Sequence, residues 1–360
     1  MSAHEILILV MAAFALLGAT DRIFGNKLGL GQEFANGIEA MGALALAMLG
    51  IIVLAPVLAG LLRPVVVPVY RHLGADPAMF AGTLLACDMG GAALAQELTQ
   101  NPDAALLGGL LTGSMLGATL VFTIPVSVGI LHKADHPYLA KGVLCGIVTL
   151  PVGILVGGLV AGFPVGMVLK NLLPVALLAG LIALGLWKAE KAMITGFSRF
   201  GKGITWLITA GLAIAIFQEL TGFLIIPGMA PLSDGFQTVG EIAILLAGAF
   251  PLVSLLTRLL RKPLLGLGKL LRIGDVAAGG LVATLANSIA TLGMVKDMDS
   301  RGKVVNLAFA VSAAFVFGDH MGFTAGFAPE MLPAVIAGKL AGGICAVALA
   351  LLLTRNTENP

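Results

Sequence analysis

The stretch TLLACDMGG, residues Thr83–Gly91, places Asp88 in the middle of an apolar run that extends over Ala78–Leu98. A carboxylate at membrane depth costs about 2.5–3.5 kcal/mol to insert, so it persists where it meets a partner, water or a cation. Gly90 and Gly91 follow directly, and glycines let a helix bend or unwind. Irregular backbone in a membrane is tolerated where it lines protein or a wet cavity. The stretch therefore predicts a broken transmembrane helix whose break carries an anionic ligand for a substrate or an ion.

The composition predicts an integral membrane protein. The 360-residue chain is 58% hydrophobic and 11% charged, whereas an ordinary soluble domain carries about 25% charged residues. Its net charge of +2 gives no reason to expect a nucleic acid as partner. Cys87, Cys145 and Cys345 lie in apolar runs without metal-ligand spacing. We therefore interpret them as small buried hydrophobic residues and expect no metal site.

Apolar windows of the length that a membrane helix needs, about 17–25 residues, recur along the whole chain. They cover approximately residues 5–20, 39–62, 78–98, 104–131, 138–162, 169–187, 204–224, 239–260, 276–295, 304–322 and 331–353. A window with a central glycine or proline is also compatible with a hairpin that enters and leaves on one side. We expect an all-α integral membrane protein, a polytopic bundle of about 10–12 transmembrane helices, some interrupted or re-entrant.

Basic residues in the connections predict the orientation. The positive-inside rule places three connections in the cytoplasm. They contain Lys188, Lys191, Arg199 and Lys202; Arg258, Arg261, Lys262, Lys269 and Arg272; and Arg63 and Arg71. A further basic connection, with Lys296, Arg301 and Lys303, falls on the opposite side if every window crosses the membrane. This conflict predicts that at least one window is re-entrant or miscounted.

A weak internal repeat relates the two halves of the chain. Leu85-Ala86 returns two hundred positions later as Leu285-Ala286, and at the same offset Thr119 corresponds to Asp319. Secondary transporters commonly bind substrate where two repeats meet at interrupted helices. The pattern is compatible with parallel or inverted repeats. We expect a single membrane domain over residues 1–360, with approximate repeats 1–162 and 204–353 joined by 163–203.

Three ionisable residues are candidates for the site. Asp88 is the first, and the alternative is a buried structural carboxylate held by helix N-termini or by a lysine from another helix. Asp319 and His320, in FVFGDHMGF, follow a glycine and interrupt an apolar run. They indicate a second break or a helix end at the interface. Histidine titrates near neutral pH, so His320 could modulate a neighbouring anion or relay a proton.

Neutral oxygen ligands come from three further positions. Asn287 and Ser288, in LANSIAT, stand at the depth of Asp88 in the second half of the chain, and Thr119 lies in GSMLGATLVF in the first. Such groups suit a solute that carries a hydroxyl. The alternative is that they form hydrogen bonds between helices.

Phe122, Phe315 and Phe317 flank the candidate polar positions. They could face a small ammonium group, or they could fill core. No stretch has the pattern of a nucleophile elbow, a P-loop, a metal triad or a dinucleotide fingerprint. We therefore predict no catalytic residue, no cofactor and no enzyme activity.

Five longer blocks of the sequence are FANGIEAMGALALAM, GADPAMFAGTLLACDMGG, GSMLGATLVFTIPV, LVATLANSIATLGMVKDMDSRGKVVN and FAVSAAFVFGDHMGF. These blocks resemble the bacterial ethanolamine permease (EutH) family of ethanolamine-utilisation operons. The resemblance extends from about Asp21 to Leu353. It implies a multi-pass protein of the bacterial inner membrane that brings ethanolamine into the cell. Composition alone does not identify that substrate.

The residues agree with what the resemblance implies. Ethanolamine at neutral pH is mostly a small cation with one hydroxyl. Asp88 or Asp319 could pair with the ammonium, and Asn287, Ser288 or Thr119 could bind the hydroxyl. We therefore expect protonated ethanolamine to be carried by alternating access around a site between the two repeats.

Two other functions are compatible with the sequence. A channel-like facilitator would line a continuous path with the same polar residues and use no coupling ion. A non-transporting sensor or scaffold of the pathway would not need them. Membrane lipid is an expected partner, and carriers with re-entrant hairpins often form symmetric oligomers, so we expect a dimer or trimer. Protons, sodium or the membrane potential alone could drive uptake.

Overall fold

The structure is a computed structural model that describes residues 3–355, without the side chains of residues 3, 260–265 and 267. Arg261 and Lys262, which belong to one of the expected basic connections, lie outside the described side chains. Helices make up the described chain, and residues 3–355 contain no strand. The all-α class predicted from the sequence is confirmed.

The helices follow one another with short connections. In chain order they are α1 (Ala3–Ile23), α2 (Leu30–His72), α3 (Ala78–Leu84), η1 (Cys87–Met89), α4 (Gly91–Leu98), α5 (Pro102–Ala105), η2 (Leu106–Gly117), η3 (Thr119–Thr123), α6 (Ile124–Ile130), η4 (Lys133–Asp135), α7 (His136–Val160), α8 (Val165–Thr221), α9 (Leu232–Leu271), α10 (Asp275–Ala286), α11 (Ser288–Met294), η5 (Val295–Asp297), α12 (Ser300–Ala313), α13 (Asp319–Phe327), η6 (Pro329–Met331) and α14 (Leu332–Leu353).

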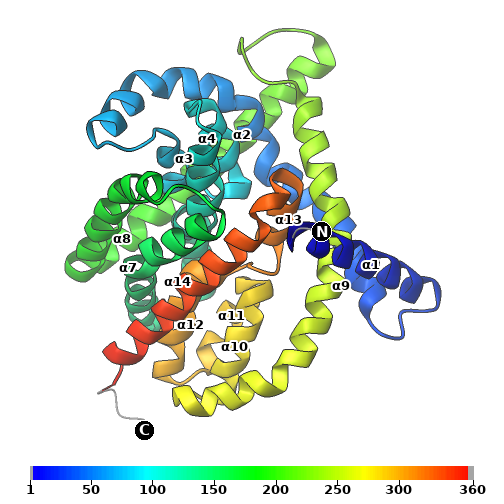
Figure 1. Ribbon diagram of the computed structural model, residues 1–360, viewed down its shortest axis with the longest axis vertical. Helices are drawn as coiled ribbons and strands as arrows, with labels where there is room; N and C mark the ends of the chain where they lie inside the picture. The colour runs from blue at the N-terminus through cyan, green and yellow to red at the C-terminus, as the bar shows by residue number, and fades with distance from the viewer. Residues whose placement is uncertain (1–2, 356–360) are drawn as a thin grey trace.

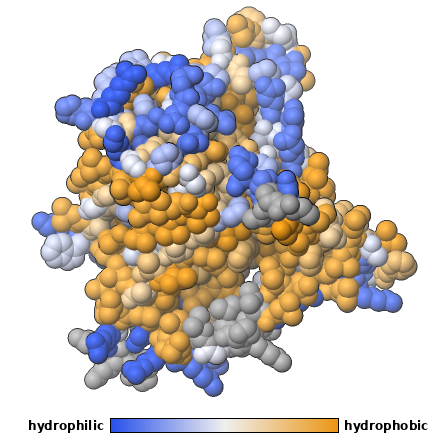
Figure 2. Space-filling model, in the orientation of Figure 1, coloured by the Kyte–Doolittle hydropathy of each residue, from blue (hydrophilic) through white to orange (hydrophobic). Residues whose placement is uncertain are grey.

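Seven helices of the described chain are long and apolar enough to cross a membrane. An apolar belt lies between more polar ends in Figure 2, as a polytopic membrane protein requires. The predicted windows correspond to fewer continuous crossings because three of them, 78–98, 276–295 and 304–322, are broken into shorter helices. Two more windows merge in α8, where Ala189 departs from helical geometry with φ −142° and ψ 48°.

The first broken window is a re-entrant hairpin, which we call the first hairpin (Ala78–Leu98). It descends through α3, turns at η1 and returns through α4. The hydroxyl of Thr99 donates a hydrogen bond to the Asp76 carboxylate over 2.8 Å. Since Asp76 precedes the hairpin and Thr99 follows it, both ends lie at the same face of the molecule.

A second hairpin (Asp275–Met294), formed by α10 and α11, is closed in the same way. The backbone N–H of Gly274 donates to the Asp299 carboxylate over 2.8 Å. The connection containing Lys296, Arg301 and Lys303 therefore returns to the end where α9 finishes. This connection therefore lies at the same end as the basic residues at the end of α9, and the prediction of a re-entrant window is confirmed.

The two hairpins enter from opposite ends of the molecule. In Figure 1, α3 and α4 lie in the upper half, whereas α10 and α11 lie in the lower half. The same view shows α2 ending near the top and α9 ending at the bottom. The connections that follow α2 and α9 are thus at opposite ends, so the expectation that both face the cytoplasm is wrong.

Each hairpin tip is in contact with the backbone of another segment, the end of η2 for the first tip and the turn after α12 for the second. At the first tip, a side chain on Gly117 of η2 would collide with the carbonyl oxygen of Leu85. At the second tip, the backbone N–H groups of Phe315 and Phe317 donate to the carbonyls of Thr284 and Leu285 over 3.1 and 2.8 Å. The first tip is thus held by close packing, whereas the hydrogen bonds at the second tip satisfy carbonyl groups that the helix break would otherwise leave unpaired.

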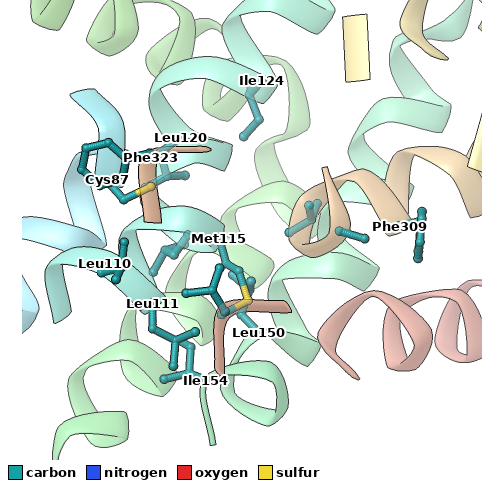
Figure 3. Packing of buried hydrophobic residues seen from close by; sticks show 14 of the residues in the cluster. Cys87, Leu110, Leu111, Met115, Leu120, Ile124, Leu150, Ile154, Phe309 and Phe323 are labelled. Atoms are coloured by element: carbon teal, nitrogen blue, oxygen red, sulfur yellow. The ribbon is translucent and has the colours of Figure 1, made fainter. Parts of the chain in front are cut away.

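The core lies where η2, α7, α12 and α14 pack together. In Figure 3, Leu111 and Met115 lie beside Ile154 and Leu150. Cys87 is buried in the same cluster and is a free thiol, as the interpretation of the cysteines predicts. Helices α7 and α14 approach closely through glycines. A side chain on Gly153 would meet the carbonyl oxygen of Gly338 at 2.7 Å.

Candidate functional site

A small cavity of about 40 Å³ lies at the tip of the first hairpin. It is lined by Ala86, Asp88, Met89, Ala118, Phe122, Phe315, Asp319 and His320. The structure therefore brings together five of the residues that the sequence singles out, from the hairpin tip, η3, the turn after α12 and α13. A water molecule occupies about 30 Å³ in the liquid, so this cavity is closed around very small groups.

Asp88 is placed by the break in the first hairpin. Gly90 has φ 88°, a left-handed conformation that favours glycine, and a side chain there would collide with Ile51 of α2. The carboxylate oxygen Oδ1 of Asp88 is buried and has no hydrogen-bond partner within residues 3–355. Its distance to Nε2 of His320 is 3.8 Å. A buried acceptor without a donor costs free energy, so this atom is the position where an external donor would be stabilised.

Lys339 is the site residue that sequence reasoning missed. It lies on α14, is 1% exposed, and its Nζ is 2.6 Å from the carbonyl oxygen of Ser114 and 3.0 Å from Nδ1 of His320. An ammonium group has only donors, so it donates to both atoms. The available signal was a lone lysine inside the apolar window 331–353.

The lysine fixes the orientation of the His320 ring. Because Nδ1 accepts from the Lys339 ammonium, the hydrogen of the neutral imidazole is assigned to Nε2, which faces Asp88. A protonated imidazole would place two donors against each other. Three side chains thus lie side by side in space: the positive Lys339, the neutral ring of His320 and the carboxylate of Asp88.

Two aromatic rings cover the cavity. Phe122 and Phe315 make an edge contact with ring centroids 5.5 Å apart, and Phe315 lies 5.4 Å from the His320 ring. Phe315 has φ 60°, a conformation that is uncommon for a bulky residue. Its hydrogen bond to Thr284 connects this strained turn to the tip of the second hairpin. An aromatic face is a suitable neighbour for an ammonium group.

A larger pocket of about 510 Å³ adjoins the cavity and reaches the second hairpin. Its lining includes Glu33, Arg258, Asn287, Phe317 and Asp319. Asp319 borders both spaces. We call this pocket the vestibule. The carboxylate of Asp319 thus stands between the vestibule and Asp88.

Two sequence candidates line neither space. The Thr119 hydroxyl oxygen lies 2.7 and 3.0 Å from the carbonyl oxygens of Met115 and Val311, so it takes part in packing between η3 and α12. Ser288 is fully buried at the start of α11, and its hydroxyl has no partner in the described part of the chain. Asn287 lines the vestibule and also accepts from the Ile289 N–H, which caps α11.

Three atoms in and beside the cavity could bind a metal ion. The sulfur of Cys87, a carboxylate oxygen of Asp88 and a ring nitrogen of His320 lie within 4.8 Å of one another. Thiolate, carboxylate and imidazole are a ligand set that divalent transition metals accept. The Lys339 ammonium at 3.0 Å from His320 would repel such an ion.

Comparisons with known proteins place the chain in a family. Residues 3–353 match the model of the family described as "Ethanolamine utilisation protein, EutH". The chain is 59% identical to a protein of Listeria monocytogenes named "Probable ethanolamine permease EutH", over 98% of this chain and 95% of that one. It is 48% identical to the Salmonella typhimurium protein of the same name, over 98% and 96% of the two chains.

A third relative has no functional name. The chain is 51% identical to the Bacillus subtilis protein called "Uncharacterized protein YxeR", over 98% of this chain and 96% of that one. No solved structure matches the chain. The full-length family match and these identities have one consequence: the chain belongs to the EutH family of ethanolamine utilisation proteins.

Proposed function

We propose that this multi-pass protein of the bacterial inner membrane carries protonated ethanolamine, and that Asp88 pairs with its ammonium group. The names of the 59% and 48% identical relatives support the substrate. The observation that carries the role of Asp88 is its buried Oδ1, which has no hydrogen-bond partner among the described residues and lies in a cavity walled by Phe122 and Phe315. An ammonium donates up to three hydrogen bonds and is stabilised by aromatic faces.

The substrate would enter from the vestibule, because Asp319 borders the vestibule and the cavity alike. There the side-chain amide of Asn287 is available to the hydroxyl of the solute. Ser288 follows it in the chain and its hydroxyl has no partner within the described residues. In this proposal the second hairpin binds the hydroxyl while the first binds the charge.

Alternating access would use the two hairpins as the moving parts. Each follows a long helix, α2 or α9, and each is closed at its base by one aspartate. This order supports the proposed repeats 1–162 and 204–353 joined by 163–203. Secondary transporters commonly bind substrate between such repeats. The homo-oligomer and the coupling ion stay predictions.

The test is uptake of labelled ethanolamine into proteoliposomes that contain the purified protein, with an imposed membrane potential and with or without proton and sodium gradients. We expect saturable uptake and accelerated exchange when unlabelled ethanolamine is placed on the opposite side. Uptake without saturation or exchange would favour the channel-like facilitator. No uptake by correctly inserted protein would favour a sensor or scaffold and overturn the proposal.

A further inference from the structure

Lys339 is a buried cation for which the proposed transport step has no use. It is 1% exposed in the middle of the membrane domain, between the carbonyl oxygen of Ser114 and the ring of His320. A charged group in a membrane is costly, so such a residue marks a functional site by default. It is an unexpected residue beside a site for a cation, because like charges repel.

We assign charges to the ionisable residues of the cavity lining and to Lys339, which contacts the lining residue His320. Asp88 and Asp319 are each assigned one negative charge, and His320 is assigned the neutral form with Nδ1 accepting from the Lys339 ammonium. The thiol of Cys87 is buried beside Asp88 and adds no charge. Lys339 contributes one positive charge. The empty site therefore has one net negative charge.

The vestibule does not change this count. Its charged lining residues besides Asp319 are Glu33 and Arg258, which have opposite signs. Arg258 also donates to the carbonyl oxygen of Leu28 over 2.6 Å. The one net negative charge thus belongs to the cavity group of Asp88, Asp319, His320 and Lys339.

We propose that Lys339 sets the site at one negative charge, so that a single monovalent ammonium neutralises the occupied site without a second cation. This inference rests on the proposed transport of protonated ethanolamine. Its physical basis is that two like charges about 4 Å apart repel by about 4 kcal/mol at an effective dielectric constant of 20. Without Lys339 the site would have two negative charges, and it would take up a proton together with the substrate.

The proposal predicts how many charges move with each ethanolamine. The measurement uses proteoliposomes with a tenfold ethanolamine gradient and equal pH on both sides. If one charge moves with each substrate, the net flux reverses at a membrane potential of about 59 mV. We expect this value for the wild type. For Lys339→Met we expect about 30 mV, the value for two charges. A pH gradient should shift the reversal potential of the variant and leave that of the wild type unchanged.

A double variant that restores the charge of the site distinguishes a charge effect from a folding defect of the Lys339→Met variant. Asp319→Asn alone leaves no net charge, and we expect ethanolamine uptake to fall at least tenfold. Asp319→Asn combined with Lys339→Met restores one negative charge. The double variant should regain uptake relative to either single variant and reverse at about 59 mV. Lys170→Met, at an exposed lysine outside the cavity, is the matched control.

The outcomes separate this proposal from the transport proposal. A reversal at about 59 mV in both the wild type and Lys339→Met would overturn the role of Lys339 and leave ethanolamine transport intact. A wild-type value near 30 mV, or a double variant that is no more active than Asp319→Asn, would also overturn it. Absence of any ethanolamine flux in the wild type would overturn both proposals.

Discussion

The two hairpins are built alike and differ at their tips. Both are closed at the base by an aspartate, Asp76 in the first and Asp299 in the second. The first tip presents the carboxylate of Asp88, whose Oδ1 has no partner in residues 3–355. The second tip presents Asn287, whose side chain accepts from the N–H of Ile289 and caps α11. The first tip leaves its carboxylate oxygen for a ligand, whereas the second tip uses its side-chain oxygen to hold its own backbone and leaves the amide nitrogen for a ligand.

This difference suggests a division of tasks. The carboxylate at the first tip faces a cavity of about 40 Å³, whereas the amide at the second tip faces a vestibule of about 510 Å³. Charge recognition takes place where water is excluded and electrostatic interactions are strong. Recognition of a neutral hydroxyl tolerates a wetter environment. The first hairpin should therefore determine whether ethanolamine binds, and the second should tune how tightly.

The largest expected effect follows from Asp88→Asn. Loss of one partner of a buried charge pair costs about 2–5 kcal/mol, so we expect ethanolamine uptake to fall at least about 30-fold. Asn287→Ala, the matched change at the second tip, should reduce uptake less than tenfold, since it removes one neutral contact. Both are measured by proteoliposome uptake normalised to inserted protein. Equal losses in the two variants would contradict the division of tasks.

The next effect tests how the first tip is held. Gly117→Ala would drive a methyl group into the carbonyl oxygen of Leu85, and overpacking of this kind costs about 1–3 kcal/mol. We expect a lower thermal midpoint in detergent. Gly180→Ala in α8, where a side chain meets nothing within 4 Å, is the control and should leave the midpoint nearly unchanged. A midpoint for Gly117→Ala equal to that of the control would show that the tip is loosely held.

Variants at the bases of the two hairpins should lower the thermal midpoint by smaller and unequal amounts. Thr99→Val removes the hydrogen bond to Asp76, worth about 1 kcal/mol, and the acceptor of the exposed Asn101 N–H, which water can replace. Asp299→Ala removes acceptors for the N–H groups of Gly274 and Gly302, and the second of these is the cap of α12. We expect the midpoint to fall more for Asp299→Ala than for Thr99→Val. The reverse order would mean that the first hairpin has the stronger closure.

The smallest effect concerns Ser288. Its buried hydroxyl has no partner within the described residues, so Ser288→Ala removes no hydrogen bond and should change stability by less than about 0.5 kcal/mol. Because Ser288 lines neither the cavity nor the vestibule, we expect the KM for ethanolamine to stay unchanged. A KM about threefold higher, as the loss of one neutral hydrogen bond requires, would show that the hydroxyl reaches the substrate. The measurements are the thermal midpoint and the concentration dependence of uptake. An unchanged KM would leave hydroxyl recognition to Asn287.

The sequence predicts the breaks because their causes are local. Asp88 followed by Gly90 and Gly91, and Gly318 before Asp319, are signals within a few residues. It does not distinguish a crossing from a hairpin, since hydropathy is the same for a chain that continues and one that returns. The hydrogen bond from Thr99 to Asp76 makes that distinction, and it joins positions that are 23 residues apart.

The rest of the site depends on contacts that the sequence does not encode locally. Lys339 lies 225 residues from Ser114, whose carbonyl it binds. Because this contact is distant in sequence, the apolar window around Lys339 does not predict that it lies at the site. Thr119 is predicted as a neutral oxygen ligand, and it also aligns with Asp319 at the offset of the weak internal repeat. Equivalent positions in two repeats need not share a cavity, and the Thr119 hydroxyl is instead directed to backbone carbonyls of η2 and α12.

The glycine contact between α7 and α14 has a mechanical consequence. A side chain on Gly338 would meet the carbonyl oxygen of Gly153 at 2.7 Å, and one on Gly153 would meet the Cα of Gly342 at 3.1 Å. Two backbones in such close contact cannot slide past each other without separating, so α7 and α14 should move as one body. In the proposed alternating access, Lys339 would stay at a constant position while Asp88 would move with its hairpin tip. The distance between a stationary positive charge and a mobile negative one would measure the progress of the transport cycle.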